Sequence, residues 1–431
     1  MRNHSLIRCL LVNLLFSIFS PIDLFAQQAH PHLKNLVFQN ESKKYVQIPF
    51  TMVNNLMVIQ VSINHSDSLN FIFDSGVTYP IVSDPTIIDE LNFEPRKIRE
   101  VDIKGWGTGE DVHAYHTWGN TIEIKGVEGL NQDIIYASKD VLLLSKNMGV
   151  KVHGLIGATI FNHFVVQVDY QKKVITLYKQ DYYASKKRIK YKKRYECFPV
   201  EIKRNRCYMT TTIFSSETNS FENLNLLVDT GASHALSVFE SENTPLKASL
   251  KAIRDHLGVG INGDLYGKVN RLDQLKIGDF LLENPIVKYP EFNSLNQNLF
   301  DKSRHGSIGS EVLRRFTVVF DYHNKEILLK KNNDFRDEFS YNHLGLEFNN
   351  PYPGLPYFEV SQIRELSPAF KAGIKKGDRL VQVNGQAISL MSVDEVRTLF
   401  RGKDGRKLSL EIEDKSGSYK EYTLTLEDPF K

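Results

Sequence analysis

The chain has 431 residues, more than one hydrophobic core usually organises, which indicates two or three domains. Its hydrophobic (41%), charged (24%) and aromatic (11%) fractions are typical of folded soluble proteins and exclude a largely disordered chain. The net charge of +3 excludes a global field that would attract nucleic acid or an acidic membrane surface.

The N-terminus has the pattern of an export signal over residues 1–26. Arg2 and Arg8 precede a largely apolar run, Cys9 to Phe19, that is too short to cross a bilayer comfortably. A polar break and Leu-Phe-Ala follow, so we expect cleavage after Ala26, with an uncleaved anchor as the alternative. No stable membrane span is then expected in the mature chain.

An internal repeat dominates the rest of the chain. Residues 153–179 align without gaps to residues 305–331, and residues 69–83 match residues 224–238. Each copy contains a β-rich hairpin, an apolar strand ending in Asp-Ser/Thr-Gly, a Gly-containing segment, His-Gly-x-Ile-Gly and a final strand pair. The pattern predicts a mainly β fold built from a duplicated lobe.

The two copies define a first lobe (27–180) and a second lobe (197–336), joined by a basic linker (181–196). The linker contains the run Lys186 to Arg194, which has the composition of a site for a polyanion or a membrane surface. The run is short and the chain is nearly neutral, so a solvated connection between the lobes is the favoured interpretation.

Two cysteines, Cys197 and Cys207, remain after the signal. If Arg204 and Asn205 form a hairpin turn, the cross-strand register does not bring the two thiols opposite each other. Two ordinary thiols are therefore the simpler prediction, and a disulfide is the alternative.

After Asp334 the pattern changes, and we predict a third, α+β domain at residues 340–429. Ser392 and Glu395 form a capping box that opens an amphipathic helix through Phe400. Further along the chain a polar turn joins two closing strands.

Two acidic turns carry the candidate chemistry. Asp74-Ser75-Gly76 and Asp229-Thr230-Gly231 each end an apolar strand, at matching points of the repeat. If the lobes pack around a pseudo-twofold axis, the two carboxylates meet at that axis. Close carboxylates share one proton, so one acts as an acid and the other as a base, which suits amide hydrolysis by an activated water.

These motifs resemble those of the pepsin and retropepsin superfamily of aspartic proteases, over roughly residues 45–335. The resemblance implies two β-lobes around a central cleft, with Asp74 and Asp229 as the catalytic pair. It also implies that six residues support the active-site turns: Ser75, Gly76, Thr230, Gly231, Gly157 and Gly309. The segment Trp106, Gly107, Thr108, Gly109 is similar to the tip of the flap that closes over the substrate, with an ordinary hairpin tip as the alternative.

Val77 follows the first acidic turn, where this family usually has a small residue or a hydroxyl. A non-catalytic peptide-binding scaffold is therefore the alternative function. Neither Val77 nor Ala232 donates the hydroxyl hydrogen bond that would favour an ionised carboxylate. We therefore expect an activity optimum nearer neutral pH than that of a gastric enzyme. His153 and His305 begin equivalent segments and are predicted to be structural.

The third domain contains SPAFKAG followed by GDRLVQVNG and resembles a PDZ domain of the type attached to bacterial exported proteases. The resemblance implies that Leu344, Gly345 and Leu346 form the loop that holds a peptide's C-terminal carboxylate. Val396, with Leu399 or Phe400, would line the side-chain pocket. A PDZ domain that only packs on the lobes is the alternative.

The sequence contains no His-Glu-x-x-His motif, no Cys/His cluster and no phosphate-binding loop, so no metal or cofactor is predicted. The expected partners are a peptide or protein substrate and a C-terminal peptide at the PDZ domain, without nucleic acid. Both acidic turns lie in one chain, so a monomer suffices. The signal and the PDZ pattern predict an exported protein, periplasmic or extracellular in a bacterium.

Overall fold

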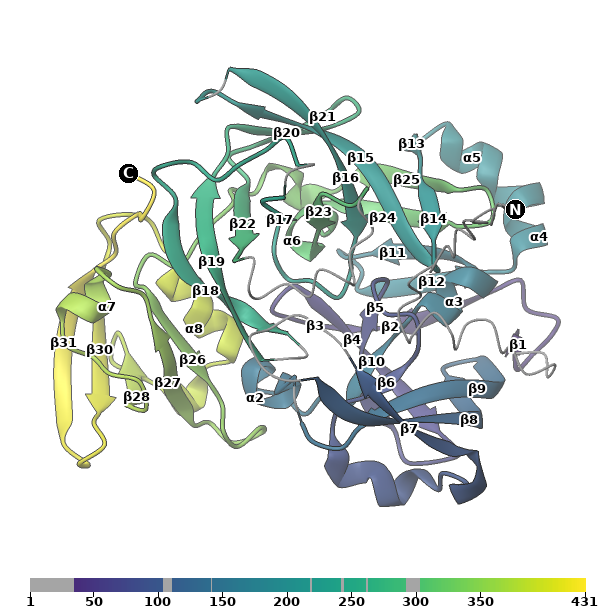
Figure 1. The fold of residues 1–431 in the computed structure, drawn as a ribbon, viewed down its shortest axis with the longest axis horizontal. Helices are drawn as coiled ribbons and strands as arrows, with labels where there is room; N and C mark the ends of the chain where they lie inside the picture. The colour runs from purple at the N-terminus through teal and green to yellow at the C-terminus, as the bar shows by residue number, and fades with distance from the viewer. Residues whose placement is uncertain are drawn as a thin grey trace, which may run out of the picture. The chain divides into compact units, whose positions relative to one another are not determined.

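A computed structural model describes residues 35–103, 111–140, 142–217, 219–241, 244–260, 263–291 and 303–431. The predicted export signal (1–26) and the predicted flap tip (Trp106, Gly107, Thr108 and Gly109) lie outside these residues. Strands predominate in the described part of the chain (Figure 1), which confirms the mainly β fold class. None of the described helices is long and apolar enough to cross a membrane.

The first sheet belongs to the first lobe and has nine strands among the described residues, in the order β1-β9-β6-β10-β5-β4-β8-β7 with β3 paired to β4. Its strands are β1 (Asn35–Phe38), β3 (Thr51–Val53), β4 (Leu56–Ile63), β5 (Leu69–Asp74), β6 (Ile81–Val82), β7 (Ile98–Ile103), β8 (Val112–Ile124), β9 (Val127–Ala137) and β10 (Gly154–Gly157). The strand β5 lies inside the sheet and is an almost continuous apolar run, as expected for a strand covered on both faces.

A ten-stranded sheet repeats this topology in the described part of the second lobe, in the order β18-β19-β22-β17-β23-β16-β15-β20-β21 with β14 paired to β15. Its strands are β14 (Glu201–Lys203), β15 (Arg206–Ser215), β16 (Ser220–Val228), β17 (Leu236–Val238), β18 (Ile253–Gly260), β19 (Gly263–Arg271), β20 (Gln274–Ile277), β21 (Phe280–Glu283), β22 (Ile286–Pro290) and β23 (Gly306–Ile308). β23 runs parallel to β16 just as β10 runs parallel to β5, so equivalent strands have equivalent neighbours.

A six-stranded sheet joins the lobes, in the order β13-β25-β24-β11-β12-β2. Its strands are β2 (Tyr45–Pro49), β11 (Val165–Asp169), β12 (Val174–Tyr178), β13 (Glu196–Pro199), β24 (Phe316–Asp321) and β25 (Glu326–Lys331). At its centre β11 pairs with β24, and Gln167 lies opposite Val319. These two residues are 152 positions apart, which is the offset of the repeat, so a pseudo-twofold axis relating the lobes passes between them.

The linker is helical and packs on this shared sheet. It comprises α4 (Gln180–Tyr182), the π-helical turn η3 (Tyr183–Lys187) and α5 (Arg188–Lys192). The Tyr183 side chain is fully buried, whereas most of the linker's lysines are exposed. Arg188 and Lys192 form ion pairs with Glu326 of β25 at 3.1 and 2.6 Å. The basic run is thus a mainly solvated connection held to the second lobe by one carboxylate.

Both cysteines are free thiols. Cys197 lies in β13, opposite Leu328 of the shared sheet, whereas Cys207 lies in β15 of the second-lobe sheet, opposite Ile202. The predicted turn at Arg204-Asn205 is present, and both of its residues have positive φ. The cysteines therefore end in different sheets, and the simpler of the two predictions is confirmed.

The C-terminal domain has its own six-stranded sheet, β26-β27-β28-β30-β31 with β29 paired to β28. Its elements are β26 (Leu346–Asn349), β27 (Phe358–Ile363), α7 (Pro368–Lys371), β28 (Arg379–Val383), β29 (Gln386–Ala387), η7 (Ile388–Leu390), α8 (Val393–Phe400), β30 (Lys407–Glu413) and β31 (Tyr419–Thr425). The predicted capping box is present, because the Glu395 backbone N–H donates to Ser392 Oγ and the Ser392 N–H donates to Glu395 Oε2.

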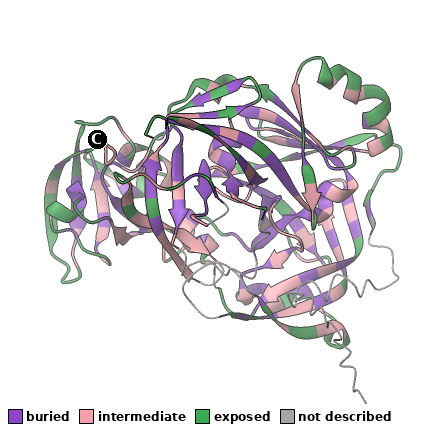
Figure 2. Ribbon diagram, turned by 45° about the horizontal axis from the view of Figure 1, so that its top comes forward, coloured by how far each residue is buried: buried purple, intermediate pink, exposed green. Residues whose placement is uncertain are grey.

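Short helices connect the strands of the lobes. They are η1 (Pro85–Leu91), η2 (Pro95–Lys97), α2 (Leu144–Met148), α3 (Ala158–His163), α6 (Ser310–Leu313) and η6 (Asn333–Arg336). Burial is concentrated in the strands, as Figure 2 shows, and the strands that end at the acidic turns are among the most buried. The acidic turns therefore start from rigid, tightly packed elements.

Candidate active site

The two acidic turns lie at the ends of buried strands. β5 ends at Asp74, which is only 6% exposed, and β16 leads directly into Asp229. Each carboxylate accepts a hydrogen bond from the glycine two residues later: Gly76 N–H donates to Asp74 Oδ1 at 2.6 Å, and Gly231 N–H donates to Asp229 Oδ1 at 3.0 Å. Each turn therefore orients its own carboxylate.

Reciprocal hydrogen bonds join the two turns across the lobes. The backbone N–H of Ser75 donates to Thr230 Oγ1 at 2.9 Å, and the N–H of Thr230 donates to Ser75 Oγ at 3.0 Å. The Ser75 hydroxyl then donates to the carbonyl of Val228, and the Thr230 hydroxyl to that of Phe73, both at 2.8 Å. Both hydroxyls are fully buried, so this four-bond arrangement fixes one turn against the other.

Close approach of neighbouring atoms requires glycine at three of the predicted support positions and leaves little room at a fourth, Gly76. A Cβ on Gly157 would lie 1.5 Å from the carbonyl oxygen of Asp74, and one on Gly309 would lie 2.3 Å from that of His234. A Cβ on Gly231 would lie 2.1 Å from Asp74 Cγ, and one on Gly76 would lie 3.0 Å from Asp74 Oδ1. The first three positions exclude any side chain, because something would have to move.

The two carboxylates interact directly and have unequal proton affinities. Burial, and then the neighbouring charge of Asp229, raise the pKa of Asp74 to about 8. Burial also raises the pKa of Asp229, but Arg304 opposes this shift, as do the Gly231 N–H, a hydrogen bond from Asp74 and the charge of Arg206. These opposing effects favour the shared proton on Asp74 and the negative charge on Asp229.

The two copies of the repeat differ beside the carboxyl groups: Arg206 lowers the pKa of both, whereas Arg304 lowers only that of Asp229. Beside the Asp74 turn the first lobe has an apolar cluster, defined by Val53, Leu56, Val58, Ile72, Met148, Val152 and Leu155, with Val77 packed against it. The second lobe has Arg206 where the first has Leu56, and Arg304 where the first has Val152. Sequence reasoning missed both arginines, although the repeat alignment itself contained the signal: an apolar residue in one copy replaced by a cation in the other.

Arg304 therefore offers a direct test of the pair's electrostatics. Arg304→Gln should raise the pKa of Asp229, because it removes the positive charge that most opposes the burial effect. The acidic limb of any activity that needs ionised Asp229 should then move to higher pH, as a pH–rate profile would show. Arg254→Gln is the matched control, since Arg254 is exposed, pairs with Glu291 and should leave the limb in place. An unmoved limb in Arg304→Gln would contradict this electrostatic assignment.

The paired histidines have equivalent structural roles. His153 Nδ1 accepts from the backbone N–H of Asn70 at 2.9 Å, and His305 Nδ1 accepts from that of Asn225 at 3.1 Å. The backbone N–H of each histidine in turn donates to the backbone carbonyl of the same asparagine. Burial lowers the pKa of both imidazoles. They link strands at the same place in each lobe, in agreement with the predicted structural role.

The hairpin predicted to carry the flap is described up to its tip. β7 pairs with β8 from Ile98 opposite Thr117 to Ile103 opposite Val112. At its base, Tyr79 and His116 have ring centroids 6.0 Å apart, and His116 lies 3.4 Å from Asp133. Burial, and then the charge of Asp133, raise the pKa of Tyr79.

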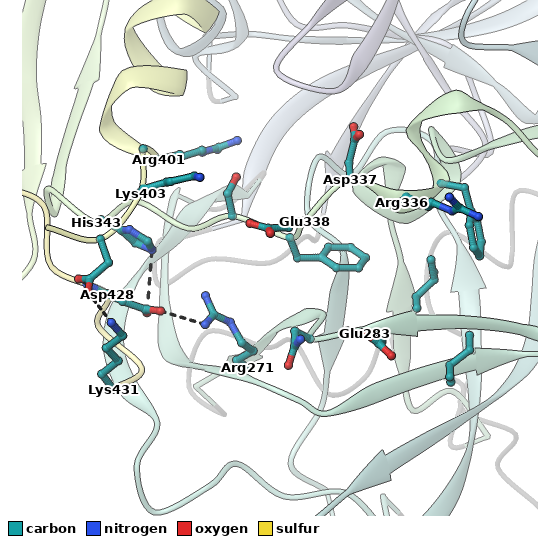
Figure 3. A pocket seen from close by; sticks show the side chains of 18 residues that line it. Arg271, Glu283, Arg336, Asp337, Glu338, His343, Arg401, Lys403, Asp428 and Lys431 are labelled. Atoms are coloured by element: carbon teal, nitrogen blue, oxygen red, sulfur yellow. Dashed lines mark hydrogen bonds and ion pairs between the residues drawn. The ribbon is translucent and has the colours of Figure 1, made fainter. Parts of the chain in front are cut away.

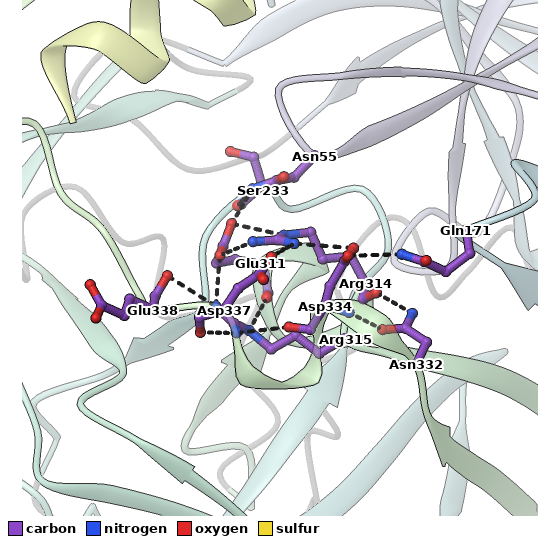
Figure 4. A network of polar contacts seen from close by, with 10 residues as sticks. All are labelled: Asn55, Gln171, Ser233, Glu311, Arg314, Arg315, Asn332, Asp334, Asp337 and Glu338. Carbon is purple, nitrogen blue, oxygen red and sulfur yellow. Dashed lines mark hydrogen bonds and ion pairs between the residues drawn. The ribbon is translucent and has the colours of Figure 1, made fainter. Parts of the chain in front are cut away.

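A polar network around α6 joins the first lobe to the segment that enters the C-terminal domain (Figure 4). The Ser310 hydroxyl, at the start of α6, donates to the carbonyl of Thr230 at 3.0 Å. In the same helix Glu311 accepts from the fully buried Arg315 at 3.1 Å and from Asn55 of the first lobe. The Arg315 guanidinium also donates to carbonyls of the segment that enters the C-terminal domain: Asp334, Asp337 and Glu338. Arg315 thus ties α6 to the segment that enters the C-terminal domain, and Glu311 ties the same helix to the first lobe.

A cavity of about 840 Å³ lies away from the carboxylate pair (Figure 3). It is lined by the second lobe and the C-terminal domain, with Arg271 bound to Asp428 at 2.9 Å on one side. Neither Asp74 nor Asp229 lines it. Within the described residues no group of three His, Cys, Asp or Glu side chains gathers to hold a metal ion.

Comparison with known proteins assigns the C-terminal domain. A protein-family model of the PDZ domain matches residues 359–414. Residues 359–414 form a PDZ domain. A 46-residue stretch of the chain is 50% identical to the "Carboxy-terminal processing protease CtpA" of Bacillus subtilis (strain 168). That stretch is 11% of this chain and 10% of the relative, so the two proteins are similar over about a tenth of their lengths.

The structure corrects the predicted peptide pocket of the PDZ domain. Val396 is fully buried and Phe400 is 1% exposed, and both pack in the domain's own core. The cause is helical periodicity: positions 396 and 400 share the inward face of α8, whereas Val393 and Arg397 share another face. The capping box fixes where the helix starts, but it does not fix which face meets a ligand.

The predicted carboxylate-binding loop is also placed differently from the expectation. The backbone N–H groups of Leu344 and Gly345 donate to Asn342 Oδ1 at 3.1 and 2.9 Å. The side chains of Leu344 and Leu346 are fully buried. Two of the loop's N–H groups, those of Leu344 and Gly345, thus already have an acceptor within the chain.

Proposed function

We propose that the chain is an aspartic endopeptidase that hydrolyses peptide bonds with a water activated by Asp74 and Asp229. The observation that carries this proposal is the buried carboxylate pair, held between the lobes by the reciprocal Ser75–Thr230 hydrogen bonds. Two buried carboxyl groups cannot both ionise cheaply, so a site that holds them together points to a use for their shared proton.

The unequal pKa values assign the roles. Ionised Asp229 takes a proton from the water as its oxygen attacks the scissile carbonyl carbon, and protonated Asp74 gives its proton to the carbonyl oxygen. The tetrahedral diol then collapses: the C–N bond breaks, the amine leaves with a proton from Asp229, and a diol hydroxyl returns a proton to Asp74. The pair ends in its starting state, without a covalent intermediate.

A peptide library tests the proposal. Purified mature chain, beginning after Ala26, would be incubated with peptides of diverse sequence from pH 4 to pH 9, and the products mapped by mass spectrometry. Internal cleavage without added metal is the expected result. Binding of peptides without cleavage at any pH would support the peptide-binding scaffold instead. The PDZ domain supports a peptide-directed function in either case.

The pH dependence of kcat/KM should be bell-shaped with its upper limb near pH 8. Activity requires a proton on Asp74, and burial raises the pKa of that carboxyl to about 8. The lower limb should lie above the usual range for a carboxylate, because burial also raises the pKa of Asp229. Initial rates on one cleaved peptide across this range measure both limbs. An optimum confined to strongly acidic pH would contradict the assignment.

A further inference from the structure

A PDZ domain binds a peptide as an added strand at a sheet edge, which in this chain places the peptide groove beside the edge strand β26, next to helix α8. The first-lobe segment Leu144–Gly149 contacts both of these elements. The helix α2 contacts β26, and in Figure 1 it lies beside α8. At the end of β26 the Asn350 N–H donates to the carbonyl of Lys146 at 2.8 Å. From α8, Arg397 Nη2 donates to the carbonyl of Asn147 at 2.7 Å. Both walls of the groove are thus hydrogen-bonded to consecutive carbonyls of α2.

The segment leaves the groove through a glycine that packs directly on α8. A Cβ built on Gly149 would lie 2.3 Å from Cγ2 of Val393 and 3.5 Å from its Cβ. Next to this contact, the Asn54 N–H donates to the Asp394 carboxylate at 3.1 and 3.0 Å. The Cγ2 methyl group of Val393 is therefore the atom that blocks a side chain at position 149.

The groove is chemically suited to this occupant. The carbonyls of Lys146 and Asn147 belong to the end of a helical turn, where backbone acceptors have no partner within the helix. Arg397, which is 13% exposed, supplies a charged donor to one of them. Two N–H groups of the loop that would hold a free carboxylate already donate to Asn342.

The same segment contributes to the apolar cluster beside the Asp74 turn. Met148 is a buried member of that cluster, Leu144 packs against it, and so does Val77, which follows Asp74-Ser75-Gly76. Val77 is larger than the residue that usually follows this turn in the aspartic protease family. Its side chain packs against the same cluster as Met148 and Leu144 of the segment in the PDZ groove. A change at the groove reaches the first acidic turn through one packed layer of side chains.

We propose that the PDZ groove binds the chain's own internal segment Leu144–Gly149. It recognises the free carbonyls at the end of a helical turn that is followed by glycine, and it does not require a C-terminal carboxylate. A peptide of the same chemistry, presented by another protein, would compete for the groove. This inference does not rest on the proposed peptidase activity, because docking and binding are measured without turnover.

Variants at the glycine contact test the docking. Gly149→Ala should release the segment Leu144–Gly149 from the groove, because the new Cβ clashes with Val393 Cγ2. The double variant Gly149→Ala/Val393→Ala should restore docking, since the two Cβ atoms that remain are in ordinary contact. The unfavourable φ of +72° at position 149 is the same in both variants, so the pair isolates the clash. Val393→Phe should also displace the segment, because its larger side chain fills the space over Gly149, which is itself unchanged.

Hydrogen exchange of the full chain provides the first measurement. The Asn350 and Asn54 amides should be protected in the wild type, exchange at least tenfold faster in Gly149→Ala and in Val393→Phe, and regain protection in the double variant. Unprotected amides in the wild type, or equal exchange in all four proteins, would overturn docking in cis.

Peptide binding provides the second measurement. A dye-labelled peptide of residues 142–150 with both ends blocked should bind Gly149→Ala at least tenfold more tightly than the wild type, by fluorescence anisotropy. Freeing its C-terminal carboxylate should change the affinity less than twofold. Tight binding by the wild type that requires the free carboxylate would overturn the assigned ligand.

Discussion

Asp229→Asn is expected to abolish peptide hydrolysis while the chain remains folded and still binds peptide. The amide keeps the size of the carboxyl and can accept the Gly231 N–H hydrogen bond, but it cannot take a proton from water. General base catalysis alone contributes about 10²–10⁴-fold to a rate, so turnover should fall by at least that factor. Single-turnover cleavage of one mapped peptide, with binding measured separately, distinguishes lost chemistry from lost affinity.

Asp74→Asn should be equally inactive for the opposite reason, because it removes the acid that protonates the carbonyl oxygen. Its stability should also respond differently to pH. The raised pKa of Asp74 means that the folded chain binds this proton more tightly than the unfolded chain, so its contribution to stability is full below the ordinary carboxyl pKa. That contribution is lost as pH rises towards about 8. Asp74→Asn should therefore gain stability relative to the wild type between pH 4 and pH 8.

Exposed carboxylates provide the control for both substitutions. Asp67→Asn changes a solvent-exposed side chain with the same chemistry and should leave turnover and the pH dependence of unfolding unchanged. Full activity in either Asp74→Asn or Asp229→Asn would remove the carboxylate mechanism and favour the scaffold. Thermal unfolding of all four proteins at pH 4 and pH 8 completes the comparison.

The repeat allowed the core of the site to be predicted from sequence. Because both copies contain Asp-Ser/Thr-Gly after an apolar strand, an axis between the lobes was enough to bring Asp74 and Asp229 together. The register of Gln167 opposite Val319 places that axis at equivalent residues. The predicted catalytic roles themselves stay predictions until the variants are measured.

What differs between the copies was not predicted. The charge of Arg304 lowers the pKa of Asp229. The first copy has Val152 at this position, and a repeat alignment that is searched only for identical residues does not reveal such a difference. The PDZ pocket failed for another reason. The spacing of Val396 and Phe400 is correct for one face of α8, but only the tertiary packing decides that this face meets the core. Contacts between domains, such as Arg397 with Asn147, have no local sequence signal.

Thr230→Val is expected to be the most destabilising single change among the conservative substitutions at the two turns. The shape is nearly preserved, but the hydroxyl that accepts from the Ser75 N–H and donates to the Phe73 carbonyl is lost. Both groups are then left without that partner at a fully buried site, at a cost of about 1–3 kcal/mol each. A total of about 2–6 kcal/mol is a large part of the 5–15 kcal/mol that typically separates folded from unfolded domains.

Thr230→Ser separates the hydroxyl from the methyl group. It keeps both hydrogen bonds and loses only buried apolar surface, so its cost should be about 1 kcal/mol. Chemical denaturation of the two variants beside the wild type measures the difference, and residual activity should follow the same order, because the hydroxyl positions one acidic turn against the other. Equal denaturation midpoints for Thr230→Val and Thr230→Ser would show that the reciprocal hydrogen bonds do not hold the lobes together. A clearly lower midpoint for Thr230→Val than for Thr230→Ser, with a similar loss in Ser75→Ala, which removes the hydrogen bonds of the Ser75 hydroxyl to Thr230 and Val228, would establish that the two hydroxyls fix the carboxylate pair.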